Sequence, residues 1–322
     1  MRIAFTSCFS AEYFPQQPIW SQIAAANPDV LVLLGDSVYY DVGTNVDMAA
    51  IKKMDATRFA AHAHGKFSRQ LALPEFQALI QSPSLSTYAI WDDHDFLWND
   101  ACGANVLKEP QHKELLYPSR ATFAAYREAL AQRLAPGSFP PAPPHWSSKT
   151  PAPGYSVVAL PENVFLHLTD GRSFRKRAAL TGKTTAVMGR AQLDAMEAKM
   201  VAAPAGAVHL VASGSVFDAY HGETWLDCKS EYDRLKKMAE QHNIVVLSGD
   251  DHDAHRKTIQ VTGTRRLYEA TASGAALYSG VIAGNEQRNY GMLTIDSTYV
   301  GIDVYKWGKS QDPKAIDRTT WL

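Results

Sequence analysis

Several short apolar segments of this chain run directly into clusters of acidic, histidine or cysteine residues. Four of them do so: residues 3–7 lead into Cys8, residues 30–34 into Gly35-Asp36, residues 87–91 into Asp92-Asp93-His94-Asp95, and residues 244–248 into Gly249-Asp250-Asp251-His252. The segments are too apolar for half-exposed strands, so we predict strands that are buried on both faces in an α/β protein. Ligands of open α/β sheets bind beyond the carboxyl ends of the strands. We therefore expect these clusters to converge.

A single acidic residue after a strand has an ordinary explanation, because Asp often caps a helix or begins a turn. Cys8 alone fits a small buried hydrophobe, Tyr39 alone a core residue, and Asp170 alone an ion-pair partner of a nearby arginine. Asp92 and Asp93 point in opposite directions if their strand continues, which would leave one of them as a ligand. Four clusters are too many for caps alone. Unpaired carboxylates at one edge repel each other and bound cations remove that repulsion, so the sequence predicts a metal site.

The remaining sequence predicts one domain over residues 1–322, because it contains no repeat and no clean boundary. Amphipathic stretches predict helices over 19–27, 46–63, 74–81, 119–134, 190–201 and 230–242, and residues 266–307 alternate in the manner of three or four further strands. Seven of the 17 prolines fall within residues 135–154, which predicts an extended surface loop. This loop is either a solvated connector or a rim that carries Trp146 over the active site.

Composition excludes several classes of function. The 32 Lys and Arg residues nearly balance 33 Asp and Glu residues, so there is no broad basic surface for nucleic acid and an anionic ligand must be held locally. No apolar run approaches the roughly 20 residues of a membrane helix. The chain has no secretory signal pattern, and its three cysteines are too few for a disulfide scaffold, so we expect a protein that is cytoplasmic or already processed. The sequence does not indicate an oligomeric state.

The motifs together resemble those of the alkaline phosphatase D (PhoD-like) family, which belongs to the calcineurin-like metallophosphoesterases and is related to the purple acid phosphatases. The resemblance rests on Ser7-Cys8, Gly35-Asp36-Ser37-Val38-Tyr39-Tyr40-Asp41, Trp91-Asp92-Asp93-His94-Asp95-Phe96 followed by Asn99-Asp100, and Ser248-Gly249-Asp250-Asp251-His252. Weaker matches include Thr169-Asp170-Gly171-Arg172-Ser173-Phe174-Arg175 and Trp225, and the resemblance spans residues 3–256. It implies a four-layer α/β/β/α sandwich with a metal cluster at the strand ends.

The resemblance also implies which residues bind the first metal. Asp36 corresponds to the carboxylate that bridges two ions, and Cys8, Tyr39 and His252 would complete the shell of a ferric ion. A phenol with a pKa near 10 is a poor ligand unless a strongly charged ion displaces its proton, which favours Fe³⁺ over Ca²⁺ at this position. Tyr40, one residue further on, is expected to point away and pack.

The second metal is expected to bind through oxygen. By the same resemblance, Asp93 and Asp250 would hold it, and their hard oxygens favour Ca²⁺ or another oxygen-preferring ion over Zn²⁺, with Mn²⁺, Zn²⁺ or Mg²⁺ as alternatives. A further calcium ion is expected near Asp92, Asn99 and Asp100. Asp251 stands where the family usually has an apolar residue, and we expect it to adjust the surroundings of the site or to face solvent.

The activity that the resemblance implies is hydrolysis of a small phosphoester by a metal-activated water. His94 occupies the general-acid position, and we expect Asp95 or a neighbouring acid to orient it. Arg172, Arg120 or Arg175 would bind the phosphate oxygens, because a guanidinium group matches them bidentately. Monoesters and diesters are both open as substrates.

Two other classes of function are compatible with a metal site. An amidohydrolase usually carries a His-x-His motif after its first strand, where this chain has Ser7-Cys8. The other alternative is a catalytically silent or non-phosphatase metal-binding protein on the same fold. Loss of an expected ligand would favour it, but every expected position is filled.

Overall fold

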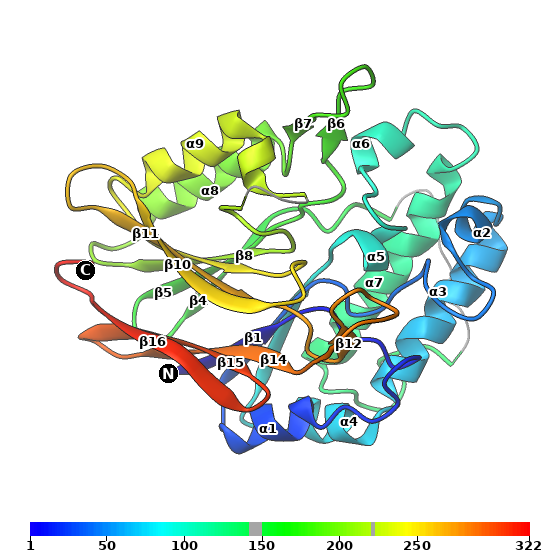
Figure 1. The fold of residues 1–322 in the computed structure, drawn as a ribbon, viewed down its shortest axis with the longest axis horizontal. Coiled ribbons are helices and arrows are strands. Elements are labelled where there is room, and N and C mark those ends of the chain that lie inside the picture. The colour runs from blue at the N-terminus through cyan, green and yellow to red at the C-terminus, as the bar shows by residue number, and fades with distance from the viewer. Residues whose placement is uncertain (142–149, 220–222) are drawn as a thin grey trace.

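The computed structural model describes residues 1–141, 150–219 and 223–322, and two six-stranded sheets form its centre (Figure 1). The first sheet has the order β16 (Lys309–Asp317), β15 (Tyr299–Lys306), β14 (Asn289–Ile295), β1 (Arg2–Thr6), β2 (Val30–Leu34), β3 (Ser86–Ile90). The second has the order β10 (Ala254–Gln260), β11 (Arg266–Ala272), β9 (Asn243–Ser248), β8 (Val208–Ser213), β5 (Val164–Leu168), β4 (Ser156–Leu160). Two short hairpins, β6 (Lys176–Arg177) with β7 (Thr184–Ala186) and β12 (Leu277–Tyr278) with β13 (Glu286–Gln287), lie outside these sheets.

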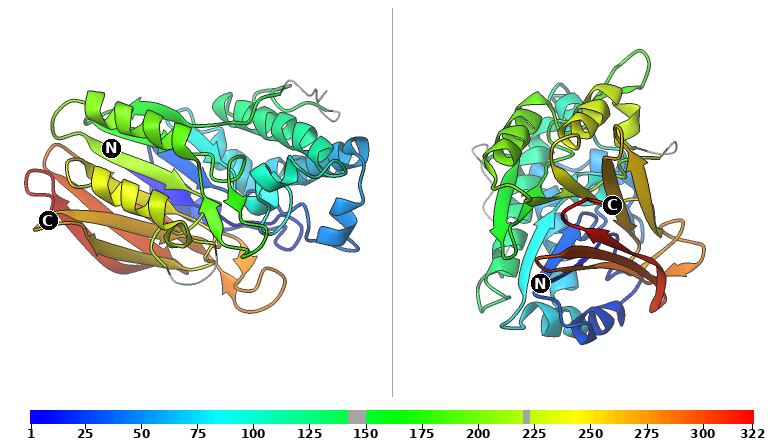
Figure 2. Two further views of the ribbon diagram at one scale, coloured as in Figure 1. Left: turned by 90° about the horizontal axis from the view of Figure 1, so that it is seen from above. Right: turned by 90° about the vertical axis from the view of Figure 1, so that its left-hand side faces the viewer.

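Helices cover the outer face of each sheet, which gives four layers (Figures 1 and 2). The first sheet packs against α1 (Ile19–Ala25), α3 (Ala56–Leu71), α4 (Pro74–Ile80) and α7 (Leu116–Ala131). The second packs against α8 (Arg190–Ala202) and α9 (Lys229–Met238). Shorter elements connect these layers: α2 (Met48–Lys52), α5 (Asp93–Phe96), α6 (Gly103–Val106), η1 (Lys113–Leu115) and η2 (Trp225–Asp227). The predicted α/β/β/α sandwich is confirmed.

The central strands are apolar on both faces because each face packs on a different layer. Val30, Val32 and Leu34 of β2 point into the core between the sheets. Leu31 and Leu33 of the same strand point into the core under the helices. Successive side chains of a strand point to opposite faces, so a continuous apolar run is what a strand in this position requires.

Besides the short hairpin of β6 and β7, the sequence missed three strands of the two six-stranded sheets, and all three lie at sheet edges. They are β4, β10 and β16. An edge strand has one neighbour and more contact with water, so it does not need a continuous apolar run. The β10 sequence Ala-His-Arg-Lys-Thr-Ile-Gln, for example, carries no pattern of a buried strand.

The helix predicted over residues 46–63 is two helices. Asp47 accepts a hydrogen bond from the backbone N–H of Ala50 at 2.7 Å and begins α2, and Asp55 accepts one from Arg58 at 2.8 Å and begins α3. An Asp in this role favours a new helix start because it satisfies an unpaired N–H of the first turn.

Part of the proline-rich segment lies outside the described residues. These are residues 142–149, which include Trp146, so the role predicted for that side chain stays a prediction. Before them, the carbonyl oxygen of Pro140 accepts a hydrogen bond from His64 at 2.7 Å, which ties the segment to α3. Within residues 1–141, 150–219 and 223–322, no helix is long and apolar enough to cross a membrane.

A buried histidine pair joins two strands of the second sheet. Nε2 of His167 on β5 lies 3.0 Å from Nδ1 of His209 on β8, and the Tyr155 hydroxyl lies 2.7 Å from Nδ1 of His167. Burial, together with the neighbouring histidines, lowers the pKa of His167 to about 3. Burial and His242 lower the pKa of His209 to about 4. Both rings are therefore neutral in the folded protein at neutral pH.

We predict that this pair makes the fold acid-sensitive. Below the ordinary histidine pKa of 6.5, these two histidines become protonated in the unfolded chain. In the folded chain they stay neutral down to about pH 4, so the free energy of unfolding decreases as pH falls from 6.5 to 4. Each such proton costs about 1.4 kcal/mol of unfolding free energy per pH unit. Urea denaturation between pH 7 and 4 should show a shallower pH slope in the variant His167→Gln/His209→Gln than in the wild type. Equal slopes would contradict the prediction.

Candidate metal centre

The carboxyl ends of β1, β2, β3 and β9 bring the predicted clusters together. Three groups of side chains, each with ligand atoms within 4.8 Å of one another, contain Asp36: Cys8, Asp36 and His252; Asp36, Asp93 and His94; and Asp36, Asp92, Asp93 and Asp250. Asp36 thus lies between a group that contains sulfur and nitrogen and a group that contains only carboxylates. A carboxylate in this place is suited to contact two cations at once.

The two carboxylate oxygens of Asp36 face different neighbours. Oδ2 lies 3.4 Å from the Cys8 sulfur and 3.3 Å from the Tyr39 hydroxyl. The same hydroxyl lies 3.4 Å from Nε2 of His252, so these four side chains surround one point. Oδ1 accepts a hydrogen bond from the backbone N–H of His94 at 3.2 Å, which holds Asp36 against α5.

Four of these residues have a left-handed backbone conformation. The φ angles are 60° for Cys8, 50° for Asp36, 73° for Asp250 and 50° for His252. This region is unfavourable for residues with a Cβ atom, and such residues gather at functional sites where the surrounding structure enforces them. Here the turn after each strand redirects the side chain toward the shared centre.

Two glycines allow the chain to close around Asp92. A Cβ atom on Gly35, whose φ is +102°, would lie 2.6 Å from the Cβ atom of Asp92. A Cβ atom on Gly214 would lie 2.4 Å from Oδ1 of the same residue. The ends of β2, β3 and β8 therefore meet at Asp92 with no room for a larger residue. The β3 strand stops before Asp92, which instead begins α5, so Asp92 and Asp93 do not alternate across a strand.

The electrostatics of the cluster favour a cation. Burial raises the pKa of Asp36 and Asp250 well above the ordinary range, and the neighbouring negative groups raise it further. Burial also raises the pKa of the Cys8 thiol to about 11 and that of Tyr39 above its usual value. Oδ1 of Asp93 is buried and accepts no hydrogen bond. A bound cation would offset the cost of ionising these groups and would contact the Asp93 oxygen that accepts no hydrogen bond, so the side chains fit a metal centre.

The residues predicted for a further calcium are only partly assembled. Asp93, Asp100 and Glu223 form another group with ligand atoms within 4.8 Å, and the backbone N–H of Asp100 donates to Oδ2 of Asp93 at 2.7 Å. Asn99 is exposed, and its backbone N–H donates to Asp41 at 2.7 Å. Glu223 was not found from the sequence, because it follows no predicted strand and stands in no recognisable motif.

The ring of His94, the residue predicted to be the general acid, is held by Asp41. Nδ1 of His94 lies 2.6 Å from Oδ1 of Asp41, and its ring packs on that of Tyr39 with centroids 4.3 Å apart. Burial alone would lower the pKa of His94, but Asp93, the bond to Asp41 and Asp36 together raise it well above the usual value. These carboxylates favour the protonated form of the imidazole, which can donate a proton.

Nδ1 of His94 contacts Asp41, which favours a neighbouring acid over Asp95 as the group that orients His94. The Asp95 carboxylate accepts hydrogen bonds from the backbone N–H groups of Ser37 at 2.9 Å and Asp92 at 2.7 Å. Burial raises the pKa of Asp95 to about 8. These bonds tie the loop after β2 to the start of α5, and Asp95 belongs to none of the metal groups found among the described residues, so its catalytic role stays a prediction.

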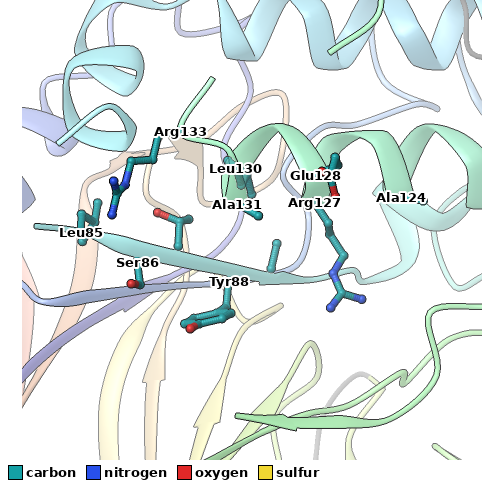
Figure 3. Close-up of a pocket in the computed structure, with 11 residues that line it drawn as sticks. Leu85, Ser86, Tyr88, Ala124, Arg127, Glu128, Leu130, Ala131 and Arg133 are labelled. Carbon is teal, nitrogen blue, oxygen red and sulfur yellow. The ribbon is translucent and has the colours of Figure 1, made fainter. Parts of the chain in front are cut away.

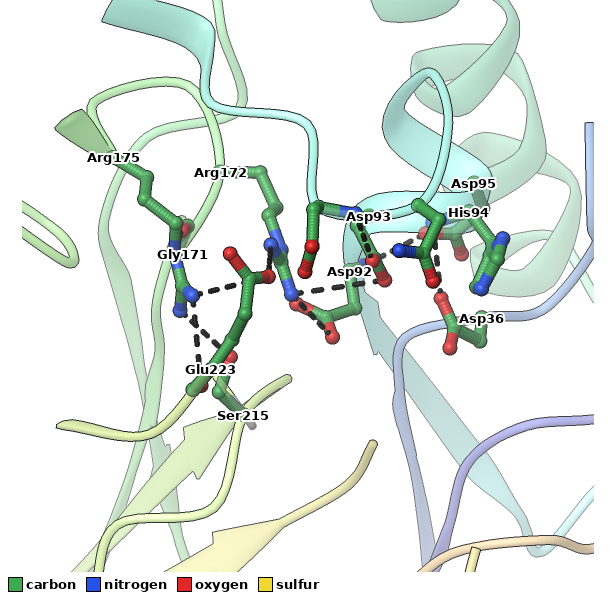
Figure 4. A network of polar contacts seen from close by, with 12 residues as sticks. Asp36, Asp92, Asp93, His94, Asp95, Gly171, Arg172, Arg175, Ser215 and Glu223 are labelled. Carbon is green, nitrogen blue, oxygen red and sulfur yellow. Dashed lines mark hydrogen bonds and ion pairs between the residues drawn. The ribbon is translucent and has the colours of Figure 1, made fainter. Parts of the chain in front are cut away.

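Arg172 and Arg175 are fully buried and already have partners (Figure 4). Arg172 binds Asp92 through Nε at 2.6 Å and Nη2 at 2.9 Å, and binds Glu223 through Nη1. Arg175 donates to Gly171, Ser215 and Glu223. Neither group can reach a phosphate without breaking these contacts, which does not fit the phosphate-binding role predicted from the sequence.

Three further residues that were discussed in the sequence analysis lie outside the candidate metal groups. Nε of Arg120 on α7 is buried with no hydrogen-bond partner among the described residues, and Asp170 is a negatively charged group near it. Tyr40 packs edge-on against Phe59 in the core, as expected. Asp251 lies 3.6 Å from Nδ1 of His255 rather than within a metal group.

A cavity of about 490 Å³ lies elsewhere, between β3 and α7 (Figure 3). Tyr88, Arg127 and Arg133 are among the residues that line it. None of the candidate metal ligands does so, so this cavity is separate from the metal centre.

Comparison with known proteins places the chain in a family. The sequence profile of the PhoD-like phosphatase family matches residues 3–290. The chain therefore belongs to the PhoD-like phosphatases and is a metal-dependent hydrolase of phosphoester bonds. No curated protein matches the chain significantly.

Solved structures share its fold at low sequence identity. The structure of PhoD aligns with a TM-score of 0.69 at 15% identity over 99% of this chain and 70% of that one. A dimetal phosphatase from Danio rerio aligns with a TM-score of 0.55 at 10% identity over 99% of both chains. These similarities support the fold.

We predict that Asp36→Asn abolishes hydrolysis and reduces bound metal, because the amide carries no charge to hold two cations. The matched control is Asp170→Asn. Asp170 is equally buried but accepts hydrogen bonds from Trp91 and Gly154 and belongs to none of the metal groups found. The control should lower thermal stability and keep its metal. Elemental analysis and activity assays on both variants measure this, and an Asp36→Asn protein with normal metal content would refute the bridging role.

Proposed function

We propose that the chain hydrolyses small phosphate esters at a centre in which Asp36 bridges a ferric ion and an oxygen-bound divalent ion. The observation that carries the proposal is the position of Asp36 between two unlike sets of donors. Thiolate, phenolate and imidazole donors from Cys8, Tyr39 and His252 suit Fe³⁺. Carboxylates from Asp93 and Asp250 suit Ca²⁺ or a similar hard cation.

The ions would lower the pKa of a water molecule toward neutrality and offset the charge of the phosphate oxygens. The protein supplies the remaining groups. His94 would donate a proton to the leaving oxygen from Nε2, because Nδ1 is held by Asp41. Asp36, turned by its left-handed backbone, would keep the two ions at a constant separation. Arg172 would act by holding Asp92 rather than by binding substrate.

The test is a direct assay with metal analysis. Purified protein would be stripped with a chelator, reloaded with Fe³⁺ and Ca²⁺, and assayed on p-nitrophenyl phosphate and bis(p-nitrophenyl) phosphate. We expect hydrolysis of at least one ester, loss on stripping and recovery on reloading. Full metal loading without hydrolysis of either ester would favour the alternative of a silent metal-binding protein.

We predict that His94→Ala retains metal but slows hydrolysis by roughly 10²–10⁴-fold, the usual effect of losing a general acid. The loss should shrink for aryl phosphates with acidic leaving groups, because these need no proton. A series of substituted phenyl phosphates measures the dependence. An equal loss across the series would mean that His94 only shapes the site.

We predict that iron-loaded protein is coloured, because a phenolate bound to Fe³⁺ gives a visible charge-transfer band. Tyr39→Phe should remove or strongly shift the band. Tyr40→Phe is the matched control and should not change it, since that ring packs against Phe59 in the core. Absorption spectra of the three proteins at equal iron content decide this. An unchanged band in Tyr39→Phe would exclude phenolate ligation and leave Cys8 as the source of colour.

A further inference from the structure

A buried glutamate gathers three arginines beside the metal centre. The Glu223 carboxylate pairs with Nη1 of Arg172, with Nη2 of Arg177 and, at 3.3 Å, with Nη1 of Arg175. Glu223 is 6% exposed, and Arg172 and Arg175 have no exposed surface. Burial alone would raise the pKa of Glu223, but the arginines lower it, so the group is ionised.

Arg172 connects Glu223 to the carboxylates at the end of β3 (Figure 4). One side of its guanidinium group binds Asp92 bidentately, and its Nη2 atom lies 3.6 Å from Oδ1 of Asp93. That oxygen is the buried one without a hydrogen bond. Arg172 and a bound cation therefore compete for the negative charge of Asp93. The outcome of this competition depends on the other carboxylates that bind Arg172.

We propose that Glu223 is a positioning residue that sets the cation affinity of the Asp36, Asp93 and Asp250 site by offsetting part of the positive charge of Arg172, Arg175 and Arg177 and by holding Arg172 in place. With its charge in place, Arg172 stays on Asp92 and the oxygen of Asp93 remains available to a cation. Without it, three positive charges would face the site with less compensation, and Arg172 would be free to close on Asp93. This inference rests on the proposed function, because it concerns the divalent ion proposed for that site.

The test compares Glu223→Gln with Glu231→Gln in iron-loaded protein. Glu231 is the matched control because it is 7% exposed and accepts hydrogen bonds from the backbone N–H groups of Val187, Met188 and Gly189, away from the arginines. Calorimetric titration with Ca²⁺ gives the dissociation constant and the number of ions bound. Glu223→Gln should weaken Ca²⁺ binding by roughly 10–100-fold, the usual effect of losing an outer-sphere partner.

Several readouts separate positioning from damage to the fold. In Glu223→Gln the iron content and visible band should stay normal, and kcat should recover at saturating Ca²⁺. Glu231→Gln should lower the melting temperature without changing Ca²⁺ affinity. Arg177→Gln removes one positive charge and leaves Glu223 in place, so it should not weaken Ca²⁺ binding.

The outcomes that overturn the inference are distinct. Unchanged Ca²⁺ affinity in Glu223→Gln would refute it while the proposed function stands. If Glu223→Gln binds one ion fewer than the wild type, Glu223 is a metal ligand and not a positioning residue. If the variant loses iron and calcium equally, Glu223 is a structural residue. Absence of Ca²⁺ binding in the wild type would overturn the divalent assignment and the inference together.

Discussion

The concentration of buried carboxylates at one edge of two packed sheets is the constraint on which this structure depends. Asp36, Asp92, Asp93 and Asp250 come from the ends of three strands and lie within a few ångströms of one another. Such an arrangement is costly in a low-dielectric interior unless positive charge is supplied. The protein supplies part of it through Arg172, and the donor set leaves the rest to bound cations.

The layout of the site follows from which carboxylates are paired with Arg172 and which are left for bound cations. Arg172 neutralises Asp92 and fixes the junction of β2, β3 and β8, where Gly35 and Gly214 leave no spare room. Asp36 has no arginine partner among the described residues, and its oxygens face Cys8, Tyr39 and the start of α5. Arg172 therefore binds Asp92 closely and lies further from Asp93, whose Oδ1 atom accepts no hydrogen bond. A site built this way has a rigid frame and a reactive centre in adjacent residues.

Turns with a left-handed backbone conformation direct the candidate metal ligands from the strand ends toward the site. Cys8, Asp36, Asp250 and His252 each lie within a few residues of a strand end, and each has a positive φ angle. The continuous cores on both faces of the sheets hold the strands in place, so the loops can keep unfavourable backbone conformations. The stability of the sandwich thus maintains the geometry of the site.

The sequence by itself determined the α/β/β/α class, the buried central strands and the convergence of Cys8, Asp36, Asp93 and Asp250. The buried strands and the convergence follow from local patterns, because strand burial and the polar residues after a strand occupy consecutive positions, whereas the four-layer class came from the resemblance of the motifs to the PhoD-like family. Tertiary structure alone decided the partners of the charged groups. Asp41 rather than Asp95 orients His94, and Glu223 with Asp92 engages Arg172. These pairs join residues 50 to 80 positions apart, and which buried charges meet depends on how the sheets and loops pack, which no local pattern records.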